Sequence, residues 1–328
     1  MRLLAGVDGG ATKTVALVGT PDGTLVGAAR GPPSNYHNVG VRNAAMAIRT
    51  AVRAACRHGR APPKELEVVV MGLAGMDSPG DFLMGDRVAK QLGLGKKRVV
   101  KHDSVIAVYC ATLGKPGIVV NAGTGSFAAG LDSRGRVIRA GGWGRIIDDE
   151  GSAYHIGKLG IRVALRALDG SERKTAIAKL LVRKLKLPRL EQIVHEVHEK
   201  PMSVEEISAI SKLVAQAATR GDRVARDIFT YEGRALAKLV ATIARHLRMT
   251  HSSIDVYCTG GVFKSGTVIL APFKKELRRH VPRFAIRQPE FQPAIGAFVL
   301  ALQEQGVETS GQILTNLRSS YARYVRNM

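Results

Sequence analysis

The fold is decided by residues 3–29, LLAGVDGGATKTVALVGTPDGTLVGAA. Short apolar runs over 3–7, 14–18 and 24–29 are separated by a Gly/Thr-rich turn and by the tight turn Pro21-Asp22-Gly23. Apolar runs of this length between such turns are typical of neighbouring antiparallel strands. The segment therefore predicts a three-stranded meander.

Beyond the meander the pattern alternates between strands and helices, and at Gly117 it starts again. In the first half we expect strands over 68–73 and 99–101 and helices over 43–58, 81–92 and 105–113. In the second half we expect strands over 118–121, 126–131, 137–140, 254–258 and 284–286, with helical segments within 152–249 and helices over 268–280 and 294–302. A meander followed by α/β alternation, twice over, predicts two similar α/β domains whose glycine turns face each other across a cleft.

The chain divides into three parts on this pattern. Residues 1–116 form the first domain, residues 117–303 form the second with a helical insertion, and Lys115-Pro116-Gly117 joins them. Residues 304–328 form a C-terminal extension. Its apolar residues recur close to helical spacing, at Ile313, Leu314, Leu317, Tyr321, Tyr324 and Val325. We expect this helix to dock on the first domain.

Composition excludes several classes of protein. The 328 residues carry 49 Lys and Arg against 27 Asp and Glu, a net charge of +22, yet 45% are apolar, which is too many for a disordered chain. The basic residues are scattered, and no zinc finger or aromatic-basic tract is present, so we predict a basic surface and no specific nucleic acid. Three distant cysteines without a CxxC pair give no disulfide framework or metal cage. No segment suits a signal peptide or membrane span, and we expect a cytoplasmic protein.

Three glycine turns carry the candidate chemistry. Gly6 to Thr14 (GVDGGATKT) offers backbone and hydroxyl donors to phosphate oxygens, and Asp8 at the strand end suits Mg²⁺. Residues 121–127 (NAGTGSF) supply a second such turn, and residues 258–266 (CTGGVFKSG) a third, where a flat ring could lie on bare backbone. Neither GxxxxGK[ST] nor a Rossmann GxGxxG is present, which disfavours both common nucleotide folds.

These turns, in this order, resemble the phosphate-1, phosphate-2 and adenosine motifs of the actin, sugar-kinase and heat-shock-chaperone superfamily. The likeness narrows to the branch of BadF/BadG/BcrA/BcrD ATPases, N-acetylglucosamine kinases and archaeal hexokinase. The strings that carry it are GVDGGATKT, GPPSNYHNVG (31–40), MGLAGMD (71–77), KHDSVIAVYCAT (101–112), AGTGS (122–126), GGWGRIIDDEGSAYHIG (141–157), TGGV (259–262) and PAIGAFVLAL (293–302). The resemblance implies two duplicated ribonuclease H-like (actin-like ATPase) domains with an interdomain cleft and a helical insertion in the second.

The resemblance also implies roles for single residues, with ATP and Mg²⁺ as cofactors. It makes Asp103 the catalytic base that accepts the proton of a sugar hydroxyl, although an Asp before a helix is also a common N-cap. It places Asp8 on the metal. The residues implied in ATP binding are Asp8, Gly9, Gly10, Thr12, Lys13, Thr14, Thr124, Gly125, Ser126, Gly260 and Gly261. Those implied in sugar binding are Asn35, Gly75, Asp103, Thr124, Asp149 and Glu150.

The implied activity is transfer of the γ-phosphoryl group of ATP to a hexose or amino-hexose: glucose, N-acetylglucosamine or glucosamine. The alternative is an ATPase that drives a partner enzyme, although activators of that kind hold an iron–sulfur cluster on closely placed cysteines, which this chain lacks. An actin-like or chaperone-like binding module would not require Asn35, Asp103 and Asp149 together. The sequence does not decide whether the chain forms a homodimer. The chain departs from the family pattern at Asp148, where Gly is usual, and at His155, where many relatives carry Trp.

Overall fold

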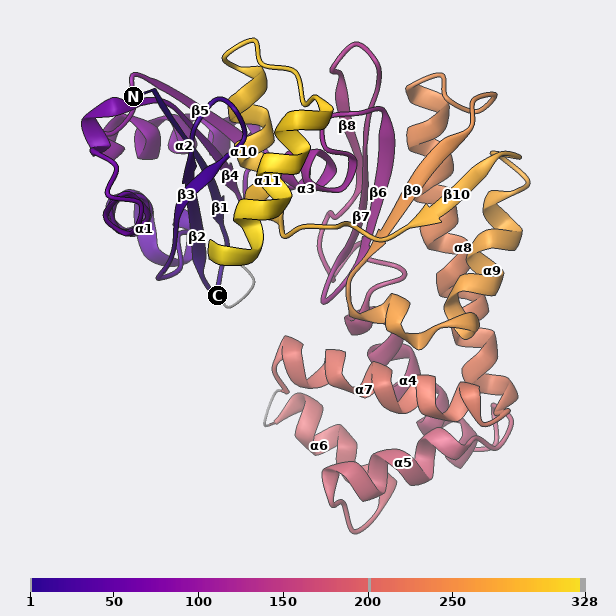
Figure 1. The fold of residues 1–328 in the computed structure, drawn as a ribbon. Helices are drawn as coiled ribbons and strands as arrows, with labels where there is room; N and C mark the ends of the chain where they lie inside the picture. The colour runs from indigo at the N-terminus through magenta and orange to yellow at the C-terminus, as the bar shows by residue number, and fades with distance from the viewer. Residues whose placement is uncertain (1, 200–201, 325–328) are drawn as a thin grey trace. The chain divides into compact units, whose positions relative to one another are not determined.

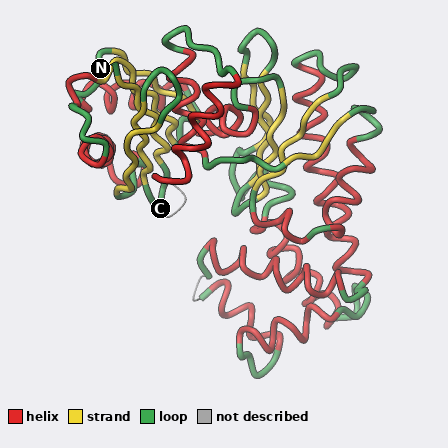
Figure 2. The backbone as a smooth tube through the Cα atoms, in the orientation of Figure 1, coloured by secondary structure: helices red, strands yellow, loops and turns green. Residues whose placement is uncertain are grey.

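The computed structural model describes residues 2–199 and 202–324 (Figures 1 and 2). The strands are β1 (Leu3–Gly9), β2 (Thr14–Gly19), β3 (Leu25–Gly31), β4 (Leu66–Leu73), β5 (Lys97–His102), β6 (Gly117–Ala122), β7 (Ser126–Leu131), β8 (Val137–Gly141), β9 (Ile254–Thr259) and β10 (Phe284–Arg287). The helices are α1 (Tyr36–His58), α2 (Pro79–Leu92), α3 (Asp103–Thr112), α4 (Ala153–Leu168), α5 (Ala176–Leu185), α6 (Ile193–His198), α7 (Val204–Thr219), α8 (Arg223–His246), α9 (Thr267–Leu277), α10 (Pro293–Gln303) and α11 (Gly311–Tyr324).

The chain forms two compact units. Unit 1 comprises Met1–Pro116, Ser133–Gly135 and Pro289–Met328, and unit 2 comprises Gly117–Asp132 and Arg136–Gln288. The division at Pro116 coincides with the expected boundary, but the second unit ends at Gln288 and not at residue 303. The reason is that α10 packs on β1, β4 and α3 of unit 1. The predicted cleft stays a prediction.

Each unit contains a five-stranded sheet of the same topology. The strand order is β3-β2-β1-β4-β5 in unit 1 and β8-β7-β6-β9-β10 in unit 2. In both, the first three strands pair antiparallel and the last two continue parallel to the first. The duplicated α/β fold predicted from the repeated meander is confirmed.

Strand β1 is buried on both faces, which explains its continuous apolar run. Leu3, Ala5 and Val7 join the core under α1. On the opposite face, a Cβ on Gly6 would lie 2.3 Å from the backbone nitrogen of Phe298 in α10. The glycine therefore lets α10 lie directly on the strand, and β1 is held in place along its length.

Helix α11 lies against β3 within unit 1. Ser320 Oγ accepts a hydrogen bond from the backbone N–H of Leu25 at 3.0 Å, and Leu317 is fully buried. The ring of Tyr321 packs edge-on against Phe291, with centroids 4.8 Å apart. Of the predicted apolar stripe, Val325 lies outside the described residues.

Unit 2 carries the helical insertion between β8 and β9. Figure 2 shows α4 to α8 as a group of helices. Helix α8 packs on β6 and β7, and α4 packs on α7. The helices of the insertion therefore share the hydrophobic core of the second sheet. Side chains of α4, α7 and α8 can line cavities beside that sheet.

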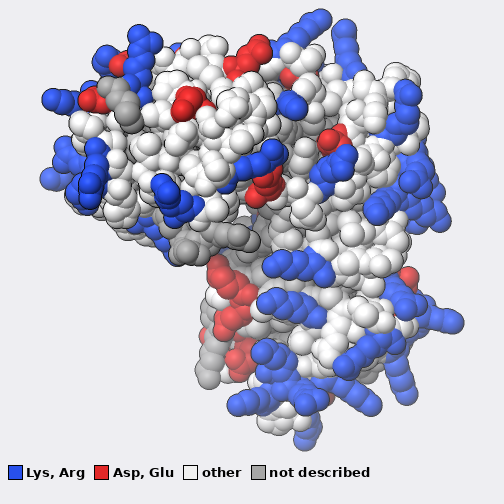
Figure 3. Space-filling model, in the orientation of Figure 1, with Lys and Arg blue, Asp and Glu red and all other residues white. Residues whose placement is uncertain are grey.

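The basic residues are distributed over the face shown in Figure 3. Figure 3 shows Lys and Arg side chains scattered over the viewed face of each unit, with Asp and Glu among them. Within the described residues, no helix has the length and apolar character needed to cross a membrane.

Candidate functional site

The first glycine turn connects β1 to β2 in unit 1. It is closed by a hydrogen bond from Gly10 N–H to the carbonyl of Lys13 at 3.0 Å, and Ala11 and Thr12 are exposed. A Cβ on Gly9 would lie 2.6 Å from Leu73 Cδ2 and 2.7 Å from Ser34 Oγ, so a larger residue there would have to displace both side chains. The turn is therefore fixed at its base and open at its tip, as a phosphate-binding loop requires.

Asp8 lies directly before this turn, with a strongly perturbed carboxyl group. Burial and the negative charge of Asp103 raise its pKa to about 6, while Lys13 acts in the opposite direction. Two repelling carboxylates beside a turn rich in N–H donors fit a divalent cation, because Mg²⁺ usually takes one or two carboxylates together with water and phosphate oxygens. The donor set therefore suits the Mg²⁺ expected from the sequence.

Thr14 is placed differently from the other residues of the turn. Its side chain is fully buried, and its hydroxyl hydrogen-bonds to the carbonyl of Pro32 at 2.6 Å and to Ser34 Oγ at 2.8 Å. The carbonyl of Gly10 accepts from the N–H groups of Ser34 and Asn35 at 3.1 and 3.2 Å. The role of the Thr14 side chain here is to hold the segment that carries Asn35 beside the turn.

Asn35 and Gly75, both expected to bind sugar, lie together in unit 1. Asn35 Oδ1 caps α1 by accepting from the N–H of His37 at 3.0 Å, and His37 Nε2 lies 3.1 Å from the carbonyl oxygen of Gly75. At Gly75, φ is +81°, and a Cβ would lie 2.7 Å from His37 Cδ2. His37 thus joins the two segments that carry Asn35 and Gly75.

Asp81 anchors the same region, and sequence reasoning did not single it out. It is hydrogen-bonded to the hydroxyl of Tyr36, and its Oδ1 lies 3.3 Å from His37 Nε2. Hydrogen bonds from Ser78 and Tyr36 lower its pKa to about 2. The signal was present in the sequence, since Ser78 and Asp81 have the spacing of a capping box, which the structure shows at the start of α2.

Asp103 is the first residue of α3, and its side chain is 39% exposed. It is not the N-cap, because that place is taken by His102, whose side chain accepts from the N–H of Ser104. The Asp103 carboxylate is therefore not committed to capping. Sequence reasoning overlooked His102, although it directly precedes the candidate base.

In unit 2, hydrogen bonds connect the second turn to residues 148–152, the DDEGS segment. Ser126 is buried, its N–H donates to Asp149 Oδ1 at 3.2 Å, and its hydroxyl donates to the carbonyl of Glu150 at 2.7 Å. Asp149 is buried with φ of +71°, a region that Asp tolerates better than most residues, and its carboxylate packs on Gly125. Burial raises the pKa of Asp149, aided by the neighbouring charges of Asp148 and Glu150. The Glu150 side chain instead faces a hollow lined by α8.

The third turn borders a cavity of ≈ 920 Å³ in unit 2. Gly260 has φ of +94°, and a Cβ there would lie 2.3 Å from the carbonyl oxygen of Ala122, so the two turns touch through bare backbone. Thr124 and Gly261 line this cavity, as does Ser208 of α7, whose buried hydroxyl has no hydrogen-bond partner among the described residues. A cavity of this size with an unsatisfied polar group at its wall suits a nucleotide. The contribution of α7 was not foreseen from the sequence.

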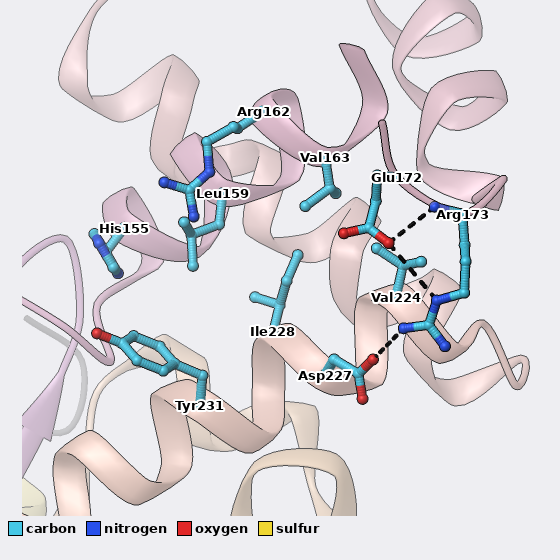
Figure 4. Close-up of a pocket in the computed structure, with 10 residues that line it drawn as sticks. All are labelled: His155, Leu159, Arg162, Val163, Glu172, Arg173, Val224, Asp227, Ile228 and Tyr231. Atoms are coloured by element: carbon cyan, nitrogen blue, oxygen red, sulfur yellow. Dashed lines mark hydrogen bonds and ion pairs between the residues drawn. The ribbon is translucent and has the colours of Figure 1, made fainter. Parts of the chain in front are cut away.

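A smaller cavity of ≈ 390 Å³ lies between α4 and α8 (Figure 4). On one side, Arg173 pairs with Glu172 and with Asp227, the latter at 2.6 Å. At the other side, His155 Nδ1 lies 2.7 Å from Oε1 of the fully buried Glu232. The charged side chains of Glu172, Arg173 and Asp227 are thus paired with one another in the cavity wall. His155 is paired with Glu232.

The three cysteines are free and buried. Burial raises the thiol pKa to about 11 for Cys56 and to about 12 for Cys110 and Cys258. Within 2–199 and 202–324 no three His, Cys, Asp or Glu side chains cluster as metal ligands. The described thiols are therefore inert side chains of the core.

Comparisons with known proteins identify the family of this chain. The chain is 28% identical over 304 residues to an N-acetylmuramic acid/N-acetylglucosamine kinase of Clostridium acetobutylicum, covering 93% of this chain and 99% of the relative. It is 28% identical to an N-acetyl-D-glucosamine kinase of Dictyostelium discoideum, with the same coverage. Its fold matches a proposed N-acetylglucosamine kinase from Chromobacterium violaceum with a TM-score of 0.71 at 24% identity, covering 92% and 99% of the two chains. Residues 5–301 match the BadF/BadG/BcrA/BcrD ATPase family, and the chain belongs to that family.

Proposed function

We propose that this protein is an ATP-dependent sugar kinase that transfers the γ-phosphoryl group of ATP to a hexose or amino-hexose. The observation that carries the proposal is the Asp103 carboxylate, which is partly exposed, uninvolved in capping and close enough to Asp8 to raise its pKa. Both curated relatives named above are N-acetylglucosamine kinases and align over 93% of the chain. An amino-hexose is therefore the first substrate to test.

The residues named above have separate roles in this proposal. The turn from Gly9 to Lys13 and the turn around Thr124 and Gly125 bind phosphate oxygens, and the cavity beside Gly260 holds the nucleoside. Asn35, Gly75 and Asp149 contribute to binding the sugar. Mg²⁺, held by Asp8 through its carboxylate, would neutralise charge on the transferring phosphoryl group. Asp103 orients the attacking hydroxyl and accepts its proton.

A sugar panel separates this function from the alternative of a partner-driving ATPase. Glucose, N-acetylglucosamine and glucosamine are each incubated with ATP, Mg²⁺ and the protein, and ADP release is measured. We expect release to depend on one or more of the sugars. A rate that is the same with and without every sugar would favour the partner-driving ATPase.

The variant Asp103→Asn tests the assigned base. It keeps the shape of the side chain but removes the proton acceptor, so kcat should fall by about 10²- to 10⁴-fold while both substrates still bind. Asp86→Asn, an exposed change of the same kind in α2, is the matched control. An Asp103→Asn enzyme with more than about a third of the normal kcat, beyond the range expected for losing a general base, would remove Asp103 from this role.

A further inference from the structure

One face of helix α7 forms a wall of the ≈ 920 Å³ cavity in unit 2. The α7 residues that line the cavity include a polar series at helical spacing: Glu205, Ser208, Lys212, Gln216 and Thr219. Another face of the same helix joins the hydrophobic core of unit 2 through Ile210 and Val214. Helix α7 is therefore fixed by its apolar face and presents hydrogen-bonding groups to the cavity.

The side-chain amide of Gln216 is the group on this face with unused hydrogen-bonding capacity. The hydroxyl of Thr219 donates to the carbonyl of Ala215 at 2.9 Å, and that of Ser211 donates to the carbonyl of Ser208 at 2.6 Å. The amide of Gln216, a half-buried residue, makes no hydrogen bond within residues 2–199 and 202–324. One acceptor and two donors of this side chain are thus free for a ligand.

Helix α4 shows which end of α7 lies toward the phosphate-binding turns. A Cβ on Gly157 of α4 would lie 2.0 Å from the carbonyl oxygen of Ile207, and a Cβ on Gly160 would lie 2.5 Å from Val214 Cγ2. The two helices therefore run side by side in the same direction, and the start of α7 lies beside the start of α4.

The start of α4 is in turn bonded to the second glycine turn, because the N–H of Ala153 donates to the carbonyl of Gly123 at 2.8 Å. Ser208 is accordingly near the phosphate end of the cavity. Gln216 lies eight residues further along α7, a separation of about 12 Å at the rise of an α-helix. This separation is comparable to the length of an adenosine moiety, so Gln216 lies where the base of a nucleotide would end.

The wall of the cavity near Gln216 is apolar. The start of α8 lies beside the end of α7, because Arg226 Nε donates to the carbonyl of Ala218 at 2.9 Å. Phe229, one turn further along α8, is 1% exposed and lines the cavity, as does the buried Val262. Apolar walls with one free amide among them suit a flat heterocycle, which needs apolar contact on its faces and hydrogen bonds at its edge.

We propose that Gln216 reads the base of the bound nucleotide and selects adenine. The proposal rests on the proposed kinase function, in which this cavity holds the nucleoside. A Gln side chain can make two hydrogen bonds to adenine, since its oxygen accepts from the N6 amino group and its nitrogen donates to a ring nitrogen. Guanine has a carbonyl oxygen in place of that amino group, so the same amide cannot make both bonds to it. Lys212, one turn nearer the phosphate end, is a point charge suited to a phosphate oxygen.

The test is nucleotide binding measured by calorimetry in the absence of sugar. The probes are ADP, GDP and purine riboside diphosphate, which lacks the N6 amino group. The unaltered protein should bind ADP about 5- to 100-fold more tightly than either of the other two, the discrimination expected from a paired amide. In Gln216→Met, which keeps the length and helix propensity of the side chain, ADP affinity should fall to that of purine riboside diphosphate.

A matched control and a kinetic measurement complete the experiment. Gln91→Met, an exposed change of the same kind in α2, should leave all three affinities unchanged. With a sugar that supports turnover, Gln216→Met should raise the KM for ATP and keep kcat within a few-fold, because the base lies away from the transferring phosphoryl group.

Equal affinities of the unaltered protein for ADP and purine riboside diphosphate would overturn the assignment, and so would a Gln216→Met variant that still prefers ADP. An equal loss for all three nucleotides would also overturn it, since that pattern indicates a damaged cavity and not a lost contact to N6. ADP release that is independent of every sugar would refute the kinase proposal alone, because the binding data do not depend on sugar. A protein that binds none of the three nucleotides would refute both.

Discussion

The Nδ1 atom of His155 lies 2.7 Å from Oε1 of Glu232, and the other carboxylate oxygen of Glu232 accepts a hydrogen bond from the backbone N–H of Gly151. Glu232 is fully buried in α8, and Gly151 directly follows Glu150 of the DDEGS segment. One buried carboxylate thus connects the insertion helix to the segment implied in sugar binding.

Replacing Glu232 by Ala should therefore affect both stability and substrate binding. It leaves the Gly151 N–H and the His155 ring without their partner in the interior, at a cost of about 2 to 5 kcal/mol in the free energy of unfolding. The KM for sugar should rise, because the DDEGS segment loses its support. Glu232→Gln keeps an acceptor for Gly151 and should cost clearly less. Urea unfolding and sugar kinetics check the pair, and equal effects of both changes would contradict this role.

The carboxyl group of Asp8 predicts a specific pH dependence of stability. Its pKa is raised from 3.8 to about 6, so the folded state binds the proton more tightly than the unfolded chain. Stability should therefore fall as pH rises from about 4 to about 6, in the absence of metal and nucleotide. Asp8→Asn should be more stable than the unaltered protein at pH 7 by about 1 to 3 kcal/mol and should lose Mg²⁺-dependent turnover. Urea unfolding at pH 4.5 and 7 measures the difference, and an unchanged pH slope in Asp8→Asn would refute it.

Gly260 and Gly261 should respond very differently to substitution by Ala. At Gly260, φ is +94° and a Cβ would lie 2.3 Å from the carbonyl oxygen of Ala122, whereas a Cβ on Gly261 meets nothing within 4 Å. Gly260→Ala should cost about 2 to 4 kcal/mol through strain and displacement of the neighbouring turn, and it should weaken ATP binding. Gly261→Ala is the control for stability. Thermal unfolding distinguishes them, and two similar melting temperatures would be evidence against this packing.

Removal of residues 308–328 should lower thermal stability and leave sugar-dependent ATP turnover within a few-fold. Helix α11 covers β3 through Leu317 and Ser320, and none of its residues is implied in ligand binding. A single change, Leu317→Ala, should cost about 2 to 4 kcal/mol because the side chain is fully buried, while the exposed Arg323→Ala should cost little. A folded deletion variant without any activity would show that the segment contributes to the site.

The sequence by itself determined the repeated α/β fold. Apolar runs between glycine turns are local signals, and the same succession from Leu3 and again from Gly117 allowed both meanders to be read without knowledge of long-range contacts. The start of α1 was placed too late, because a short helical segment from Tyr36 precedes the main helix and is separated from it by a kink at Gly40, where φ is +77°. Likewise, the sequence could not assign α10 to unit 1, since that depends on which sheet Gly6 leaves open to it.

The same distinction between local sequence signals and long-range contacts applies to the candidate site. Glycine positions such as Gly9 and Gly260 could be found from the sequence, because the absence of a side chain is a property of the residue itself. The functions of Thr14, Asp81, His102 and Glu232 depend on partners that arrive through strand pairing or helix packing from elsewhere in the chain. Tertiary structure alone decides whether a polar side chain is buried against a carboxylate, a carbonyl or a ring, and it therefore decides which of them hold the site and which act in it.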